Sequence, residues 1–128
     1  MCILLVEDDS LIRLMLAEEL SLAGYDVREA ADGTQAAGHI ENPAIPLSLL
    51  ITDVHMPGGL DGIQVAHLMG ARFPNIPIIY MTGRPDVLSE LGRLGPNQMV
   101  LSKPFVPSDL LSLVRQLLPV GEQAEGHC

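Results

Sequence analysis

Hydrophobic residues occur along the chain in five short runs, separated by longer stretches in which they recur with helical spacing. The runs, rich in Leu, Ile and Val, span residues 2–6, 25–30, 49–52, 76–81 and 99–101. The stretches of helical period span residues 10–23, 33–41, 62–73, 86–94 and 108–118. Five strands that are each followed by a helix are typical of right-handed βαβ units. The pattern therefore predicts an α/β protein with a parallel sheet.

The strand-like runs are of two kinds. Those at residues 3–6, 49–51 and 76–81 are apolar almost throughout, as expected of strands that are covered on both faces. The run at 25–29 alternates apolar and polar residues instead, which predicts an edge strand with one face in water.

Several helices have recognisable starts. Asp32 and Asp61 each precede Gly and are followed three residues later by Gln35 and Gln64, a variant of the capping box. In the last helix the predicted apolar stripe consists of Leu110, Leu113, Val114, Leu117 and Leu118. The segment 84–95 contains one Pro and two Gly, so we expect a short or mobile helix there.

The length of the chain predicts its number of domains, and its net charge limits the classes of partner. A chain of 128 residues predicts a single domain, here residues 1–119, followed by a flexible tail at 120–128. Seven basic and sixteen acidic residues give a formal charge of −9, which disfavours direct binding to nucleic acid and is compatible with binding cations.

No apolar run has the length needed to cross a membrane, and no signal peptide precedes the first strand. The only cysteines, Cys2 and Cys128, stand at opposite ends of the chain and do not resemble a disulfide framework. These features predict a cytoplasmic protein without a membrane anchor.

Polar residues follow four of the five apolar runs. They are Glu7-Asp8-Asp9 after the first run, Asp53 after the third, Thr82-Gly83 after the fourth and Ser102-Lys103-Pro104 after the fifth. The carboxyl ends of parallel strands share one edge of the sheet, where open α/β folds carry their sites. We therefore expect these carboxylates, the hydroxyl and the ammonium group to converge there.

The convergent groups suit metal-assisted phosphoryl transfer. Neighbouring carboxylates repel one another unless a cation neutralises them, and all-oxygen ligands suit Mg²⁺, with Mn²⁺ as an alternative. A carboxylate such as Asp53 can act as a nucleophile and form an aspartyl phosphate. Lys103 and the Thr82 hydroxyl would then contact the phosphoryl oxygens.

Each residue alone also has a simpler interpretation. Asp9 suits the N-cap of the helix that begins near Ser10, and Asp53 alone could be a turn residue. Lys103 alone could be an ordinary solvated lysine. His55, two residues past Asp53, would border the pocket, where it could tune hydrolysis. The combination at matching strand ends favours a functional site.

In these positions the sequence resembles the receiver domains of two-component response regulators, from Ile3 to Leu118. The matching pieces are Ile3-Leu4-Leu5-Val6-Glu7-Asp8-Asp9, Asp53-Val54-His55-Met56-Pro57 with Asp61-Gly62, Thr82-Gly83 and Lys103-Pro104-Phe105. The resemblance implies a flavodoxin-like, doubly wound sheet of five strands in the order 2-1-3-4-5. It also implies a signalling domain, not an enzyme in the ordinary sense.

The resemblance assigns roles to individual residues. Asp53 matches the phosphoacceptor, and Thr82 and Lys103 match the residues that contact the phosphate. The metal ligands would be Glu7 and Asp8, the first acting through water, together with Asp53 and the backbone carbonyl of His55. A cis peptide bond between Lys103 and Pro104 is implied as well.

Partners also follow from the resemblance. The phosphoryl group would come from a histidine kinase or a histidine phosphotransfer protein. Phosphorylation would then alter a surface around the helix at 86–94, the strand at 99–101 and the helix at 108–118, which would bind an unknown downstream protein. The chain would be either a stand-alone receiver, which Met1 and the short tail favour, or part of a larger regulator or hybrid kinase.

Three positions depart from the family pattern. The loop after Asp53 is one residue longer than usual and contains Gly58 and Gly59. Val100 stands where many receivers have an aromatic residue, and Tyr80 is not an assured replacement. The segment at 84–95 is punctuated by Gly and Pro, although the corresponding helix is often an output surface.

Other functions would use a similar arrangement. A metal-dependent phosphatase with an Asp nucleophile usually has a second Asp two residues later, where this chain has His55. A flavodoxin-like cofactor binder would need a phosphate-binding loop where Glu7-Asp8-Asp9 stands. A receiver-like adaptor that is never phosphorylated is a third alternative.

Overall fold

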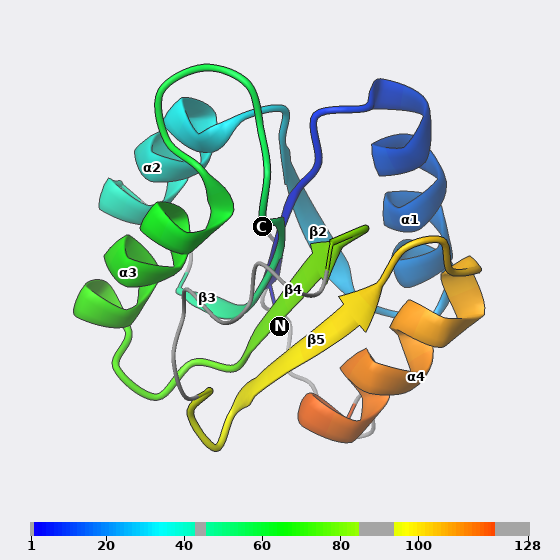
Figure 1. Cartoon of the computed structure of the whole chain (residues 1–128). Helices are drawn as coiled ribbons and strands as arrows, with labels where there is room; N and C mark the ends of the chain where they lie inside the picture. Colours follow the sequence, from blue (N-terminus) through cyan, green and yellow to red (C-terminus); the bar gives the residue numbers. More distant parts are fainter. Residues whose placement is uncertain (1, 43–45, 85–93, 120–128) are drawn as a thin grey trace.

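The computed structural model describes residues 2–42, 46–84 and 94–119 (Figure 1). Its strands are β1 (Cys2–Val6), β2 (Asp26–Ala30), β3 (Leu47–Asp53), β4 (Ile78–Thr82) and β5 (Gln98–Ser102). They form one parallel sheet in the order β2-β1-β3-β4-β5, which confirms the predicted topology.

The described helices are α1 (Ser10–Leu22), α2 (Gly33–Glu41), α3 (Gly62–Arg72) and α4 (Pro107–Leu117). None of them is long and apolar enough to cross a membrane. The predicted helix at 86–94 falls almost entirely outside the described residues, and the predicted tail at 120–128 falls wholly outside them.

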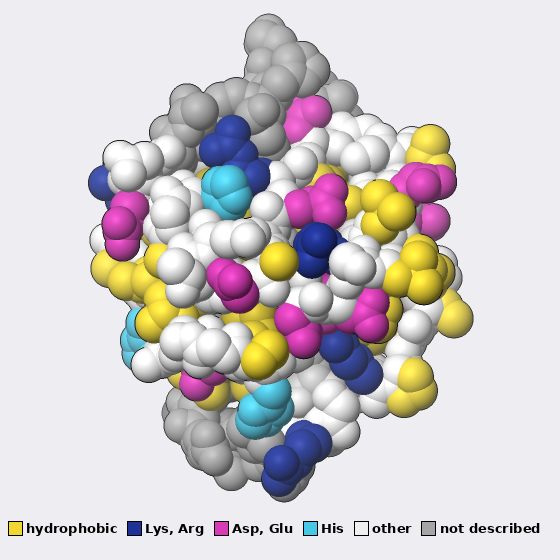
Figure 2. All heavy atoms as spheres, turned by 90° about the horizontal axis from the view of Figure 1, so that it is seen from above, with side chains coloured by type: hydrophobic (Ala, Val, Ile, Leu, Met, Phe, Trp, Pro, Cys, Tyr) yellow, Lys and Arg dark blue, Asp and Glu magenta, His cyan; other side chains and the backbone are white. Residues whose placement is uncertain are grey.

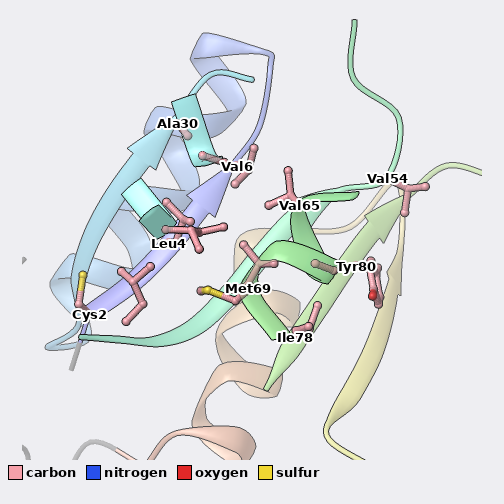
Figure 3. Close-up of a cluster of buried hydrophobic side chains, with 14 residues drawn as sticks. Cys2, Leu4, Val6, Ala30, Val54, Val65, Met69, Ile78 and Tyr80 are labelled. Atoms are coloured by element: carbon pink, nitrogen blue, oxygen red, sulfur yellow. The ribbon is translucent and has the colours of Figure 1, made fainter. Parts of the chain in front are cut away.

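Helices cover both faces of the sheet, with α2 and α3 on one side and α1 and α4 on the other (Figure 1). Successive residues of β1 therefore point into two separate cores. Leu4 packs with α2 and α3 (Figure 3), whereas Ile3 and Leu5 pack with α1 and α4. The requirement for apolar side chains on both faces explains why the central strands show no alternation.

The strand β2 lies at the edge of the sheet, as its alternating pattern predicts. Four of its five residues are at least partly exposed, and only Ala30 is buried. The preceding Tyr25 is buried against α1, and its hydroxyl donates a hydrogen bond to the carbonyl oxygen of Leu118 (2.5 Å).

The predicted helix caps are present, with one difference. Asp61 and Gln64 form a full capping box, in which each side chain accepts a hydrogen bond from the other residue's backbone N–H (2.9 Å in both cases). Asp32 accepts from Gln35 N, but the Gln35 side chain accepts from Ala31 N rather than from Asp32 N. The second cap is therefore only half of the predicted box.

The helix α4 begins one residue earlier than predicted, because Pro107 occupies its first turn and the Asp109 carboxylate accepts a hydrogen bond from Val106 N. The predicted apolar stripe omitted Leu111, which is 8% exposed. This residue is buried because α4 packs against α1 as well as against the sheet.

The described residues include only one of the two cysteines. Cys2 is 1% exposed and belongs to the core on the side of the sheet that α2 and α3 cover. The second cysteine of the chain, Cys128, lies outside the described residues.

Candidate functional site

The turn that follows β1 separates three adjacent acidic residues into different environments. Asp9 caps α1, its Oδ1 accepting hydrogen bonds from Leu11 N (3.0 Å) and Ile12 N (3.1 Å), as predicted. Glu7 is fully buried and its Oε2 accepts from Asp9 N (3.1 Å), whereas Asp8 is exposed. The capping charge is therefore supplied by Asp9, which leaves Glu7 and Asp8 for another role.

Asp53 is the last residue of β3 and is 2% exposed. Its position depends on the close approach of α3, since Gly62 N donates a hydrogen bond to Val54 O (2.9 Å). A Cβ atom at Gly62 would lie 1.8 Å from the carbonyl oxygen of Asp53, so only glycine fits here. The sequence reasoning did not assign this packing role to Gly62.

Lys103 follows β5, and its side chain reaches across the end of the sheet. Its Nζ lies 2.6 Å from Oδ1 of Asp53 and 3.1 Å from Oε1 of Glu7. The backbone N–H of Lys103 donates to Thr82 O (2.8 Å), and the bond between Lys103 and Pro104 is cis, as the family resemblance implies. Strands β1, β3 and β5 thus bring two carboxylates and one ammonium group together.

Thr82 ends β4, between Asp53 and Lys103 in the order of the strands. Its side chain is buried, and its hydroxyl accepts a hydrogen bond from Arg84 N (3.0 Å). The register pairs Asp53 with Met81 and Thr82 with Ser102. Thr82 therefore lies one position beyond Asp53 at the same edge of the sheet.

His55 lies in the exposed loop between β3 and α3. It lines a surface hollow together with Met56, Pro57, Gly58, Gly59 and Asp61. Among these residues Gly58 has a positive φ of 96°, a conformation that favours glycine. The structure thus places His55 on this hollow, two residues beyond Asp53 in the chain.

The acidic residues form a cluster that is suited to a cation. Ligand atoms from Glu7, Asp8 and Asp53 all lie within 4.8 Å of one another. Although Lys103 Nζ is close to Asp53, neither carboxylate oxygen of Asp53 accepts a hydrogen bond of favourable geometry from the residues described. Buried carboxylate oxygens without such partners fit a hard divalent ion such as Mg²⁺.

The carboxylates also perturb each other's ionisation. Burial, together with the adjacent Glu7 carboxylate, raises the pKa of Asp53 to about 8 and outweighs the attraction of Lys103. Burial would raise the pKa of Glu7 as well, but the adjacent Asp53 carboxyl group and the hydrogen bonds from Asp9 N–H and Lys103 lower it overall. For Lys103, burial lowers the pKa and the two carboxylates more than restore it, so that it stays charged. A proton held on Asp53 would be displaced by a metal ion.

At the end of the molecule where the loops after the strands lie, several acidic side chains lie around one basic side chain near the centre of the view (Figure 2). The site borders an apolar groove of about 450 Å³. The groove is lined by Ile12, Met15, Leu16, Lys103, Pro104, Phe105 and Pro107. Along α1 the side chains of Leu11, Leu14 and Met15 are more than half exposed.

The usual aromatic position is occupied differently here. Val100 is partly buried and pairs with Tyr80 in the sheet register. Tyr80 is 2% exposed and lies in the core between the sheet and α3 (Figure 3). Burial raises the pKa of its hydroxyl. Its side chain is therefore part of the core in this structure.

The fold and the site together define an open α/β protein with an acidic, lysine-containing pocket at the carboxyl edge of a 2-1-3-4-5 sheet. The family model for the response regulator receiver domain matches residues 3–115. The chain therefore belongs to the receiver domains of two-component response regulators, which are signalling domains rather than ordinary enzymes.

Two curated relatives illustrate the family. The chain is 36% identical over 117 residues to the response regulator receiver protein CpdR of Brucella abortus, and the match covers 91% of this chain and 95% of CpdR. It is 34% identical to the response regulator MprA of a Mycobacterium species, with 97% of this chain covered. That match spans only 53% of MprA, so the remainder of that regulator has no counterpart in the match.

Solved structures agree with the fold. A receiver protein from Sinorhizobium medicae has a TM-score of 0.83 and 30% identity, and the match covers 94% of this chain and 96% of that one. The receiver domain of the hybrid histidine kinase CckA has a TM-score of 0.78 and 32% identity, with 92% and 99% covered.

Proposed function

We propose that Asp53 accepts a phosphoryl group from a phosphohistidine on a histidine kinase or a phosphotransfer protein, in a reaction that depends on Mg²⁺. The observation that carries this proposal is the buried carboxylate of Asp53, held between the Lys103 ammonium group and the other acidic ligands. In the transfer, a carboxylate oxygen of Asp53 forms a bond to phosphorus while the bond from phosphorus to the histidine nitrogen breaks.

The residues of the pocket would have different roles in the transfer. Glu7, Asp8, Asp53 and the carbonyl group of His55 would hold the metal ion, which neutralises charge on the phosphoryl oxygens when bound. Lys103 already lies 2.6 Å from Asp53 and would remain beside the phosphoryl group as a second positive charge. The Thr82 hydroxyl would exchange its contact with Arg84 N for one with a phosphoryl oxygen.

This change in the contacts of the Thr82 hydroxyl would transmit the effect of phosphorylation from the pocket to the molecular surface. Arg84 lies two residues beyond Thr82, the last residue of β4, and Lys103, the first residue after β5, donates its backbone N–H to Thr82 O. We propose that the predicted helix at 86–94, which lies almost entirely outside the described residues, forms with strand β5 and helix α4 the surface that a downstream protein binds. A cytoplasmic location and the lack of direct nucleic-acid binding belong to this proposal, and the strongly acidic composition supports the latter.

The donor is proposed to be a protein because the apolar groove adjoins the pocket. Lys103 lines the groove and also contacts Asp53, so a helix placed in the groove would bring a phosphohistidine toward the acceptor. Exposed apolar side chains of α1 extend this surface, which is larger than a small phosphodonor needs.

The test is labelling with acetyl phosphate in the presence of Mg²⁺. We expect one acid-stable, base-labile phosphoryl group per chain, absent in Asp53→Asn and retained in Asp26→Asn, which changes an aspartate at the opposite end of the sheet. No labelling of the wild type, or equal labelling of Asp53→Asn, would contradict the proposal. Continuous release of phosphate from simple esters would instead favour a phosphatase.

A further inference from the structure

Arg13, in the first turns of α1, joins three elements through its guanidinium group. Its Nη1 donates a hydrogen bond to the backbone carbonyl oxygen of Glu7 (2.8 Å), and its Nε donates to Oε1 of Glu29 in β2 (3.2 Å). The Arg13 side chain is 19% exposed, so its contact with the Glu7 carbonyl group is partly buried, whereas its contact with Glu29 is exposed to solvent.

The carbonyl group that Arg13 contacts belongs to the peptide between Glu7 and Asp8. Because a peptide unit is planar, holding its oxygen fixes the direction in which the chain enters Asp8. Asp8 is exposed, and its carboxylate is a member of the acidic cluster. The orientation of this peptide therefore governs how the carboxylates of both residues face a metal ion.

We infer that Arg13 is a positioning residue for the metal site: by holding the Glu7–Asp8 peptide against β2, it sets the affinity of the acidic cluster for a divalent cation. This inference rests on the proposed function, since it assumes that the cluster binds a metal ion. It concerns a residue outside the cluster, which acts through a backbone carbonyl group.

Geometry and charge act in opposite directions at Arg13. A guanidinium group near a cation site repels the cation, so a purely electrostatic role predicts tighter metal binding when Arg13 is removed. Loss of positioning predicts weaker binding, by about tenfold, as is found for residues that orient ligands from outside the metal site. The sign of the change in affinity therefore distinguishes the two roles.

Substitution of Glu29 provides a second, independent test of the contact between Arg13 and the Glu7 carbonyl group. Its carboxylate fixes the Arg13 side chain from β2, and its own side chain is 41% exposed. Glu29→Gln should thus weaken metal binding by about threefold, less than Arg13→Ala, because the hydrogen bond to Glu7 O can persist. The double variant should behave like Arg13→Ala alone, because Glu29 acts only through Arg13.

The experiment measures the Kd for Mg²⁺ by titration calorimetry on the full chain, alongside the free energy of unfolding without metal. We expect about tenfold weaker binding in Arg13→Ala and an intermediate loss in Arg13→Lys, which keeps the charge but not the two-sided geometry. Arg72→Ala, which removes a positive charge from the far end of α3, should bind Mg²⁺ like the wild type.

Unchanged or tighter Mg²⁺ binding in Arg13→Ala, with a wild type that binds normally, would overturn this inference alone. A loss of stability without a change in Kd would overturn it too, because a purely structural role predicts that result. If Arg13→Ala does not fold, the Mg²⁺ affinities of Arg13→Lys and Glu29→Gln provide the test. Weaker binding than in the wild type supports the inference, and unchanged or tighter binding overturns it. A wild type that binds no Mg²⁺ would instead contradict the proposed function itself.

Discussion

Nζ of Lys103 lies 2.6 Å from Oδ1 of Asp53, so an ammonium group occupies one side of the proposed acceptor. The same nitrogen contacts Glu7, and its positive charge offsets part of the repulsion between the two buried carboxylates. Lys103 therefore has a part in stability before any phosphorylation takes place.

Replacing Lys103 by Ala should destabilise the metal-free protein. Removing one partner of a buried ion pair costs about 3–5 kcal/mol, but the Lys103 side chain is 31% exposed, so we expect about 1–2 kcal/mol. Chemical denaturation with and without Mg²⁺ measures this. The metal ion should stabilise Lys103→Ala more than the wild type, because it supplies the missing positive charge. Equal stabilisation would contradict this account, and Lys103→Arg provides the charge-conserving control.

Gly62→Ala should be among the most damaging single substitutions in the chain. A Cβ atom there would meet the backbone of Asp53 and Val54, which cannot move without displacing the acceptor, so we expect a loss of about 3 kcal/mol. Gly70→Ala is the matched control in the same helix, since no atom lies within 4 Å of its Cβ position. It should stabilise the protein by about 0.5–1 kcal/mol. Thermal unfolding of both variants gives the comparison, and similar effects of the two would argue against the close approach.

Asp8→Asn should separate metal binding from folding. Asp8 is exposed, so its replacement should change the stability of the metal-free protein by less than about 0.5 kcal/mol. With Mg²⁺ at about 100 times its Kd, the wild type should gain about 2.7 kcal/mol, and the variant should lose most of that gain. The melting temperature measured with and without Mg²⁺ provides the test. A variant that is stabilised by Mg²⁺ as much as the wild type would remove Asp8 from the ligand set.

Met15→Lys should impair transfer from a protein donor and leave labelling by acetyl phosphate intact. Met15 is 51% exposed in the groove, and a charge there would oppose burial of an apolar partner surface. We expect about tenfold slower transfer, in the range of a single important interface residue. His67→Lys, which adds a charge at an exposed position of α3 on the opposite face of the sheet, is the control. Equal losses with both donors would place the defect in the pocket rather than in docking.

The pattern of residues along the chain predicted the strands and helix caps of the structure well. The runs of apolar residues located all five strands, although β3 extends to Leu47 and Asp53, because it pairs there with Cys2 of β1 and Met81 of β4. The caps at Asp9 and Asp61 were predictable, since a cap is formed within four consecutive residues. Local chemistry of this kind is contained in short stretches of sequence.

The sequence by itself determined that Glu7, Asp8, Asp53, Thr82 and Lys103 stand at strand ends, and a parallel sheet places all such ends on one edge. Only the tertiary structure decided that Lys103 reaches both Glu7 and Asp53. It also decided that Gly62 must lack a side chain and that Arg13 holds the Glu7 carbonyl. These contacts join residues of different elements through distances of a few ångströms, which depend on how helices pack on the sheet and leave no periodic signal along the chain.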